Sequence, residues 1–235
     1  MKWSNAVVIL GAMWLLVVTT HTYAAQPHFI VTWHANNNAP LWFEGKHIPS
    51  DQATVTASIE AISQNPQDKG KFIDLKKSEV RWYVNDSLLE KGVGKKSIEI
   101  PGTLFRGLDL EVQVEFNYQD AQTQNASFVR TFFKIPLGEP ELVLETKTRI
   151  IKNTSPVAIR VNAFPFFFNT KNADLAMRWA INSTKVTTNE NAPFALEVGI
   201  KEPIIGQGIK VTANAQSRTD ELEQASRAVN FRIEQ

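Results

Sequence analysis

The stretch Arg81-Trp82-Tyr83-Val84-Asn85 recurs later in the chain as Arg178-Trp179-Ala180-Ile181-Asn182. Each copy is followed by an alternating, strand-like run and then by a closing apolar run, residues 128–135 after the first copy and 228–233 after the second. Because the same order of sequence features is present twice, we expect one structural unit that is repeated in tandem. Each unit has roughly a hundred residues, which is a common size for a domain.

Alternation with a period of two runs through both copies. Apolar residues occupy every second position in residues 55–61 and 108–116 of the first copy and in residues 157–163 and 209–215 of the second. Such alternation is typical of half-buried β-strands, and no later stretch shows a persuasive amphipathic helix. About seven short strands per copy, separated by turn residues, predict an all-β chain of two tandem antiparallel Ig-like β-sandwiches.

The repeat also predicts the domain bounds. Residues 27–135 are expected to form the first sandwich and residues 141–235 the second. Residues 136–140, Pro-Leu-Gly-Glu-Pro, are typical of a short, stiff linker because each proline restricts the backbone. Trp82 and Trp179 lie mid-strand at corresponding places, where sandwiches commonly bury a large ring. We therefore expect both tryptophans to anchor the cores.

The composition is that of an ordinary globular protein. Hydrophobic residues make up 43% of the chain, enough for each half to bury a core of its own. Lys and Arg number 25 against 24 Asp and Glu, so we expect no basic face for nucleic acid. The absence of cysteine excludes disulfides, thiolate metal sites and cysteine nucleophiles.

The N-terminus has the features of a signal peptide, predicted over residues 1–24. Met1-Lys2 gives a positive start, residues 6–18 are mostly apolar, and Thr22 and Ala24 fit the small positions of a cleavage site. The alternative is an uncleaved anchor, but the apolar run is shorter than the roughly twenty residues that span a bilayer. The predicted location is therefore extracytoplasmic: periplasmic, on the cell surface or secreted.

The segments Trp82-Tyr83-Val84-Asn85-Asp86 and Trp179-Ala180-Ile181-Asn182-Ser183 are each followed by a strand, a turn, an alternating strand and a closing strand. This order resembles PKD-like and related Ig-like β-sandwich domains of bacterial secreted and cell-surface proteins. The likeness covers nearly all of residues 27–235, although both copies lack the aspartate-glycine turn of a typical PKD domain. The resemblance implies a non-enzymatic extracytoplasmic module, used as a spacer or in protein and glycan contacts.

The chain offers no convergent set of catalytic, cofactor-binding or metal-binding residues. His34 and His47 lack an Asp/Glu cluster at ligand spacing, and no nucleophile elbow or phosphate loop is present. Asp109, Glu111 and Glu115 alternate along one strand, which is typical of a solvated outer face. Calcium would need three or more converging oxygens, and the other acidic residues are scattered. We predict no catalytic residue, no cofactor, no metal and no enzymatic activity.

A run of phenylalanines ends one strand of the second copy: Phe164, Phe166, Phe167 and Phe168. A strictly alternating strand can bury only half of such rings, so some should lie at the domain edge or between the domains. One interpretation is that they pack on the linker and make the pair rigid. The other is an apolar patch that docks a partner.

A second aromatic set, Trp33 with Trp42 and Phe43, lies near the asparagines at positions 36–38. One interpretation is a loop that folds down over the end of the sandwich. The other is a glycan platform, in which the rings stack on sugars while the amides bond their hydroxyls.

These observations predict a non-enzymatic structural or interaction protein. It would be a rigid tandem-sandwich spacer or a subunit of a cell-surface assembly of the adhesion or pilus type. The alternative is a carbohydrate-binding module that uses the Trp33, Trp42 and Phe43 rings. The expected partner is another envelope or surface protein, or a glycan in the alternative, and not nucleic acid. Membrane contact is expected only through an uncleaved N-terminal segment.

Overall fold

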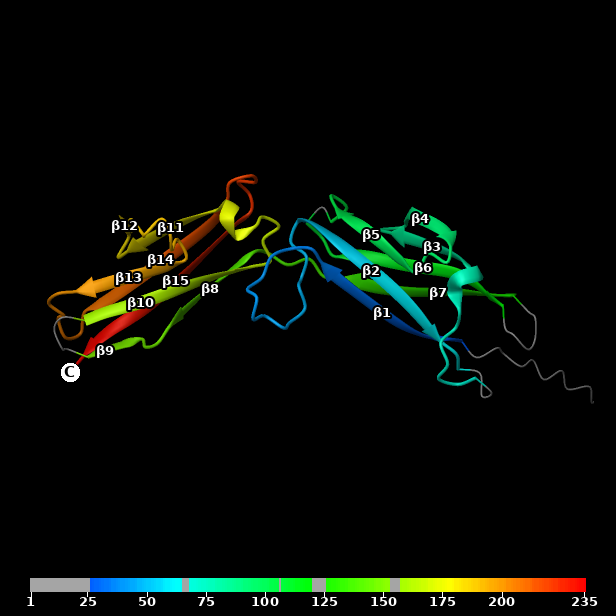
Figure 1. Cartoon of the computed structure of the whole chain (residues 1–235), viewed down its shortest axis with the longest axis horizontal. Helices are drawn as coiled ribbons and strands as arrows, with labels where there is room; N and C mark the ends of the chain where they lie inside the picture. Colours follow the sequence, from blue (N-terminus) through cyan, green and yellow to red (C-terminus); the bar gives the residue numbers. More distant parts are fainter. Residues whose placement is uncertain (1–25, 65–67, 106, 120–125, 153–156) are drawn as a thin grey trace, which may run out of the picture.

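The computed structural model describes residues 26–64, 68–105, 107–119, 126–152 and 157–235. The predicted signal peptide, residues 1–24, lies outside them. Figure 1 shows two β-sandwiches placed end to end, with a loop of the first sandwich lying beside the connection between them. Among the described residues there is no helix long and apolar enough to cross a membrane.

The first sandwich packs the sheet β1-β2-β5 against the sheet β4-β3-β6-β7. Its strands are β1 (His28–Ala35), β2 (Gln52–Ile62), β3 (Glu79–Val84), β4 (Ser87–Val93), β5 (Ser97–Gly102), β6 (Leu110–Gln119) and β7 (Ala126–Ile135). A short 3-10 helix, η1 (Leu75–Lys77), precedes β3. All strand pairs within these two sheets are antiparallel.

The second sandwich packs the sheet β13-β10-β8 against the sheet β12-β11-β14-β15-β9. Its strands are β8 (Glu141–Thr146), β9 (Ile150–Lys152), β10 (Val157–Phe166), β11 (Leu175–Ile181), β12 (Thr184–Val186), β13 (Ala195–Ile200), β14 (Gly208–Ser217) and β15 (Gln224–Glu234). A 3-10 helix, η2 (Asn172–Asp174), leads into β11.

The two sandwiches have the same strand order, because β8, β10 and β13 correspond to β1, β2 and β5, and β12-β11-β14-β15 corresponds to β4-β3-β6-β7. The predicted all-β, Ig-like sandwich fold is confirmed. The copies differ in two places. Strand β9 pairs in parallel with the end of β15, and β12 is much shorter than its counterpart β4.

Each sandwich has a separate hydrophobic core, and the repeated tryptophan lies in each. Trp82 on β3 is 0% exposed and Trp179 on β11 is 2% exposed. Their indole N–H groups donate to the carbonyls of Lys95, at 2.7 Å, and Pro193, at 2.9 Å. A large ring is thereby buried without leaving its polar atom unsatisfied.

The asparagine that follows each tryptophan strand makes a tight turn. Asn85 has φ 48° and Asp86 has φ 63°, and Asn182 and Ser183 have φ 47° and 71°. Two successive positive φ angles are those of a type I′ hairpin turn, which asparagine tolerates well. Each asparagine side chain also accepts a hydrogen bond from the neighbouring strand, Asn85 from the Glu111 N–H and Asn182 from the Lys210 N–H.

Candidate functional site

No chemical centre is assembled in the described part of the chain, which holds no group of three or more His, Cys, Asp or Glu placed to hold a metal ion. Two carboxylates of β6 form ion pairs instead: the exposed Glu111 with Lys134 at 2.9 Å and Glu115 with Arg130 at 2.7 Å. Glu115 is only 5% exposed, so the predicted solvated outer face is wrong at this position. The hydrogen bond to Glu111 raises the pKa of Lys134. The absence of enzymatic activity stays a prediction.

Trp42 and Phe43 of the first sandwich meet three rings of the phenylalanine run, Phe164, Phe166 and Phe167, in one cluster at the junction between the sandwiches. The ring of Trp42 lies 5.5 Å from that of Phe164 and 5.8 Å from that of Phe166. The ring of Phe43 lies 5.2 Å from that of Phe166 and 6.0 Å from that of Phe167. These contacts are edge-to-face, a favourable arrangement for aromatic pairs. The loop of the first sandwich and the end of β10 are therefore two halves of one contact.

The backbone also joins the two sandwiches at this cluster. The Asn38 N–H donates to the Phe168 carbonyl, and the Phe167 N–H donates to the Asn38 carbonyl, both at 2.6 Å. Phe167 has φ 62°, a left-handed conformation that is rare for a bulky residue. This turn breaks the strand alternation directly after β10, so three consecutive rings can be buried.

The docking-patch interpretation of the phenylalanine run does not fit this arrangement. Phe166, Phe167 and Phe168 are 6%, 8% and 0% exposed, and Phe164 is half-buried beside Trp42. A partner cannot reach rings that the first sandwich and the second core already cover. The run packs against the loop of the first sandwich at Trp42 and Phe43, and not on the linker as the first interpretation had it.

The three rings proposed as a glycan platform do not form one surface. Trp33 lies on β1, packs against the first core and carries the Lys46 ammonium 3.4 Å from its ring centre. Partial burial lowers the pKa of Lys46. Phe43 packs into the junction, whereas Trp42 stays 60% exposed. Trp42 and Phe43 pack edge-to-face against the end of β10, away from Trp33. The predicted glycan platform of these three rings is therefore not formed.

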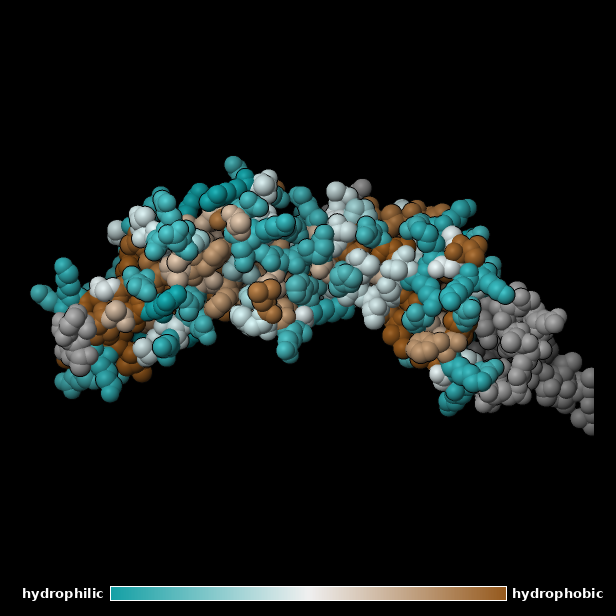
Figure 2. All heavy atoms as spheres, viewed as in Figure 1, coloured by the Kyte–Doolittle hydropathy of each residue, from teal (hydrophilic) through white to brown (hydrophobic). Residues whose placement is uncertain are grey.

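A shallow pocket remains beside the exposed face of Trp42. It has a volume of about 270 Å³ and includes Phe164, Glu145, Thr146 and Arg149 in its lining. An aromatic ring next to a carboxylate, a hydroxyl and a guanidinium offers both stacking and hydrogen bonding. The neighbouring Leu41 is fully exposed at the tip of the loop. In the face shown in Figure 2, hydrophilic residues otherwise cover most of the region between the sandwiches.

Polar groups hold another part of the junction. The Asn169 amide donates to the Asp51 carbonyl at 2.6 Å and accepts from the Ser50 hydroxyl at 3.2 Å. The buried carboxylate of Glu223 accepts from the Asn169 N–H and from the Thr170 hydroxyl. No sequence motif marks Asn169 or Glu223, because their partners lie more than fifty positions away.

The short linker, residues 136–140, is held against the first sandwich by hydrogen bonds and close packing. The Gly138 N–H donates to the Pro49 carbonyl at 2.8 Å, and the Leu137 N–H donates to the Asp109 carboxylate at 2.9 Å. A Cβ on Gly138 would lie 2.7 Å from Ile48 Cγ2, so only glycine lets the linker approach this closely. The loop, the linker and the end of β10 thus restrain the two sandwiches together.

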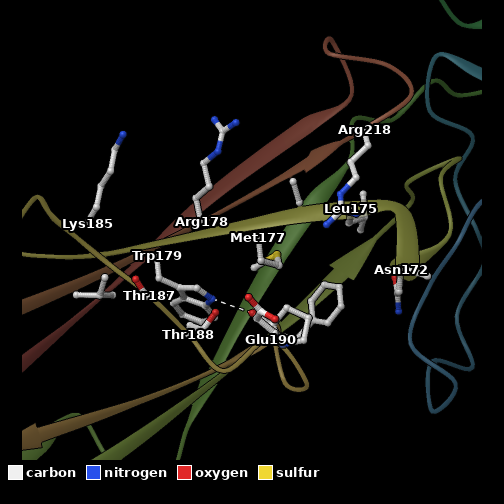
Figure 3. A pocket seen from close by; sticks show the side chains of 15 residues that line it. Asn172, Leu175, Met177, Arg178, Trp179, Lys185, Thr187, Thr188, Glu190 and Arg218 are labelled. Carbon is white, nitrogen blue, oxygen red and sulfur yellow. Dashed lines mark hydrogen bonds between the residues drawn. The ribbon is translucent and has the colours of Figure 1, made fainter.

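A separate groove of about 870 Å³ runs along β11 in the second sandwich. It is lined by β11, by β12 and by the connection that leads toward β13. Figure 3 shows Arg178, Lys185 and Arg218 on one side of the strand and Met177 and Trp179 on the other, with Glu190 beside Met177. The apolar and the cationic side chains that border this groove therefore lie on opposite faces of the sheet.

No protein-family model matches the sequence, and no curated protein matches it either. Among solved structures, three N-terminal domains of the outer capsid protein Hoc of bacteriophage RB49 are 12% identical, with a TM-score of 0.39. That match covers 88% of this chain, which spans 59% of the Hoc fragment. Domains 4 and 5 of the S-layer protein SbsC are 8% identical, with a TM-score of 0.34, over 90% of this chain and 100% of that one.

A chimeric titin Z1Z2 is 10% identical, with a TM-score of 0.31, over 89% of this chain and 97% of that one. All three likenesses are distant, with identities of 12% or less and TM-scores of 0.39 or less. The narrower PKD-like label stays a prediction, because no family model supports it.

Proposed function

We propose that this protein is a non-enzymatic, extracytoplasmic structural and interaction protein. It would act as a rigid spacer of two sandwiches or as a subunit of a cell-surface assembly, such as an adhesion or pilus apparatus. The observation that carries the proposal is the junction, where the Asn38–Phe168 backbone bridge and the ring cluster join the two sandwiches.

Rigidity follows from the number and kind of restraints. A pair of sandwiches on a free linker would bury little at the connection, as is usual for domains that move independently. Here four edge-to-face contacts cross the junction, each worth about 0.5–1.5 kcal/mol beyond area burial. Two backbone hydrogen bonds and the Asn169 amide act beside them. Such a junction would fix the distance and the angle between the two sandwiches, as a structural subunit requires.

Small-angle scattering of the full chain tests the rigid pair. The double variant Trp42→Ser/Phe43→Ser removes the first sandwich's half of the ring cluster and leaves β10 intact. We expect the variant to stay folded and to scatter as two bodies with variable spacing. The control Phe132→Ser changes an exposed ring on β7, away from the junction. Identical scattering profiles for the double variant, the control and the native chain would contradict the spacer function.

Cell fractionation with N-terminal sequencing tests the extracytoplasmic part of the proposal. The predicted signal peptide requires the mature chain to begin after residue 24 and to leave the cytoplasm. A chain that keeps Met1 and stays in the cytoplasm would rule out an envelope role.

The pocket beside Trp42 favours carbohydrate binding as the second candidate function. Its ring, carboxylate and guanidinium are the groups that would stack on a sugar and bond its hydroxyls. A glycan array with native chain, Trp42→Ala and Arg149→Ala tests it. Binding that both substitutions abolish supports this candidate, whereas no binding by the native chain removes it.

A further inference from the structure

The edge of β11 is open where the corresponding edge of the first sandwich is closed. In the first sandwich β4 pairs with β3 along its whole length, from Glu79 to Val84. In the second, β12 pairs only with Trp179–Ile181 of β11. After β12 the chain turns away, so on this edge of β11 residues 175–178 border the groove and no strand pairs with them, while β14 pairs with their other edge. The two copies share one plan, and they differ at this edge.

Backbone groups at this edge lack a partner within the described part of the chain. The Asn182 N–H donates to the Lys210 carbonyl and the Arg218 N–H to the Asp174 carbonyl, so even-numbered residues of β11 face β14. Odd-numbered residues face the opposite edge, because the hydrogen-bonding direction alternates along a strand. The Leu175 N–H donates to Asn172. This leaves the Leu175 carbonyl and both backbone groups of Met177 available to an added strand.

The side chains around the open edge differ between the two faces of the sheet. On one face, Met177 and Phe194 are half-buried in the groove lining. On the other, Arg178, Lys185 and Arg218 are exposed, and none of the three has an ion pair among the residues that the structure describes. Glu190, the acidic residue of the lining, lies on the side of Met177 (Figure 3). The cationic face therefore has no carboxylate of the groove beside it.

We propose that this groove binds an extended segment of a partner protein, in which apolar residues alternate with acidic ones, as an added strand beside β11. Backbone pairing with Met177 provides the register, as in other cases of strand addition. Alternate side chains of a strand point to opposite faces, so apolar side chains reach Met177 and Phe194 while acidic ones reach the three cations. The inference rests on the proposed role as an interaction protein and names the chemistry of its partner.

Peptide binding to the full chain tests the proposal. The probe is a short synthetic peptide in which valine alternates with glutamate, and its control peptide has lysine in place of glutamate. We expect the acidic peptide to bind and the basic one not to bind. The triple variant Arg178→Glu/Lys185→Glu/Arg218→Glu should weaken binding of the acidic peptide by more than about tenfold and allow the basic peptide to bind. These three side chains are exposed, so the variant should stay folded. The control variant Lys134→Glu alters a cation of the first sandwich and should leave binding unchanged.

Amide hydrogen exchange separates strand addition from simple charge attraction. The Met177 N–H should exchange more slowly when the acidic peptide is bound, because it then donates to the peptide backbone. Binding without Met177 protection, equal binding of both peptides, or no binding by the native chain would each overturn the proposal. A chain that is rigid by scattering but binds neither peptide would disprove this inference alone. A flexible chain that binds the acidic peptide would disprove the spacer function alone.

Discussion

Asn85 and Asn182 each have two structural roles at the turn that follows the tryptophan strand. Their backbones adopt a positive φ, which costs most residues about 1 kcal/mol, and their side chains accept a hydrogen bond from the next sheet strand. The nearby indoles of Trp82 and Trp179 are tied to loop carbonyls in the same way in both copies. The recurrence of tryptophan and asparagine at a fixed spacing thus has a structural cause in the core and the hairpin.

Substitutions at Asn85 should separate the effect of the positive φ from that of the side-chain hydrogen bond. Asn85→Ala loses both the acceptor and the tolerance of positive φ, so we expect a loss of about 2 kcal/mol of unfolding free energy. Asn85→Gly restores the backbone freedom and should lose about 1 kcal/mol, and Asn85→Asp should be nearly neutral. Urea unfolding measures all three, and the same series at Asn182 is the matched control. Equal losses for alanine and glycine would show that the backbone conformation contributes nothing.

Phe167 carries the unusual backbone of the junction. Phe167→Ala and Phe167→Gly both remove the ring, but only glycine relieves the positive φ. We therefore expect the glycine variant to be about 1 kcal/mol more stable than the alanine variant in urea unfolding. A glycine variant that is less stable than the alanine variant would mean that the left-handed conformation is not strained here.

Strands β5 and β13 occupy the same place in the two sandwiches but end differently. At Gly102 of β5, a Cβ would lie 2.0 Å from the Gln52 carbonyl carbon, where β2 begins with a register shift. At Gly199 of β13, a Cβ would have nothing within 4 Å. The same residue type therefore closes a backbone contact in one strand and lies in open space in the other.

Alanine at these two glycines should act in opposite directions. Gly102→Ala forces a clash with backbone that cannot move aside, so we expect a loss of about 1–3 kcal/mol. Gly199→Ala should gain about 0.5 kcal/mol, because alanine loses less conformational freedom in a strand. Thermal unfolding of the two variants measures both effects. A tolerated Gly102→Ala would contradict the close approach of β5 to β2.

The whole molecule combines two independent cores with one shared junction. The core of the first sandwich is centred on Trp82 and that of the second on Trp179, and the rings that touch across the boundary belong to the junction loop and the end of β10. Each sandwich should therefore be able to stay folded when the other unfolds. The junction should then lose its protection from amide hydrogen exchange.

Hydrogen exchange on Trp82→Ala tests this separation. The substitution should cost the first sandwich about 3–5 kcal/mol, because a large buried ring is removed. We expect faster exchange through β1–β7 and at residues 166–170, with β11, β14 and β15 still protected. The native chain is the reference, and Trp179→Ala should give the mirror-image pattern. Loss of protection throughout the chain would show a single cooperative unit.

The fold follows from local patterns. The period of two along residues 108–116, the doubled Trp-x-x-Asn stretch and the turn residues after it are enough to predict strands, hairpins and a sandwich used in tandem, because each depends on neighbours in sequence. The burial of Trp82 and Trp179 was predictable for the same reason. Tertiary structure decided the rest. Whether Phe166–Phe168 faced solvent or the first sandwich depended on a loop more than a hundred positions away and on one positive φ at Phe167. The open edge of β11 depended on where β12 ends, and a propensity pattern does not contain that information, because pairing is a contact between strands and not a property of either one.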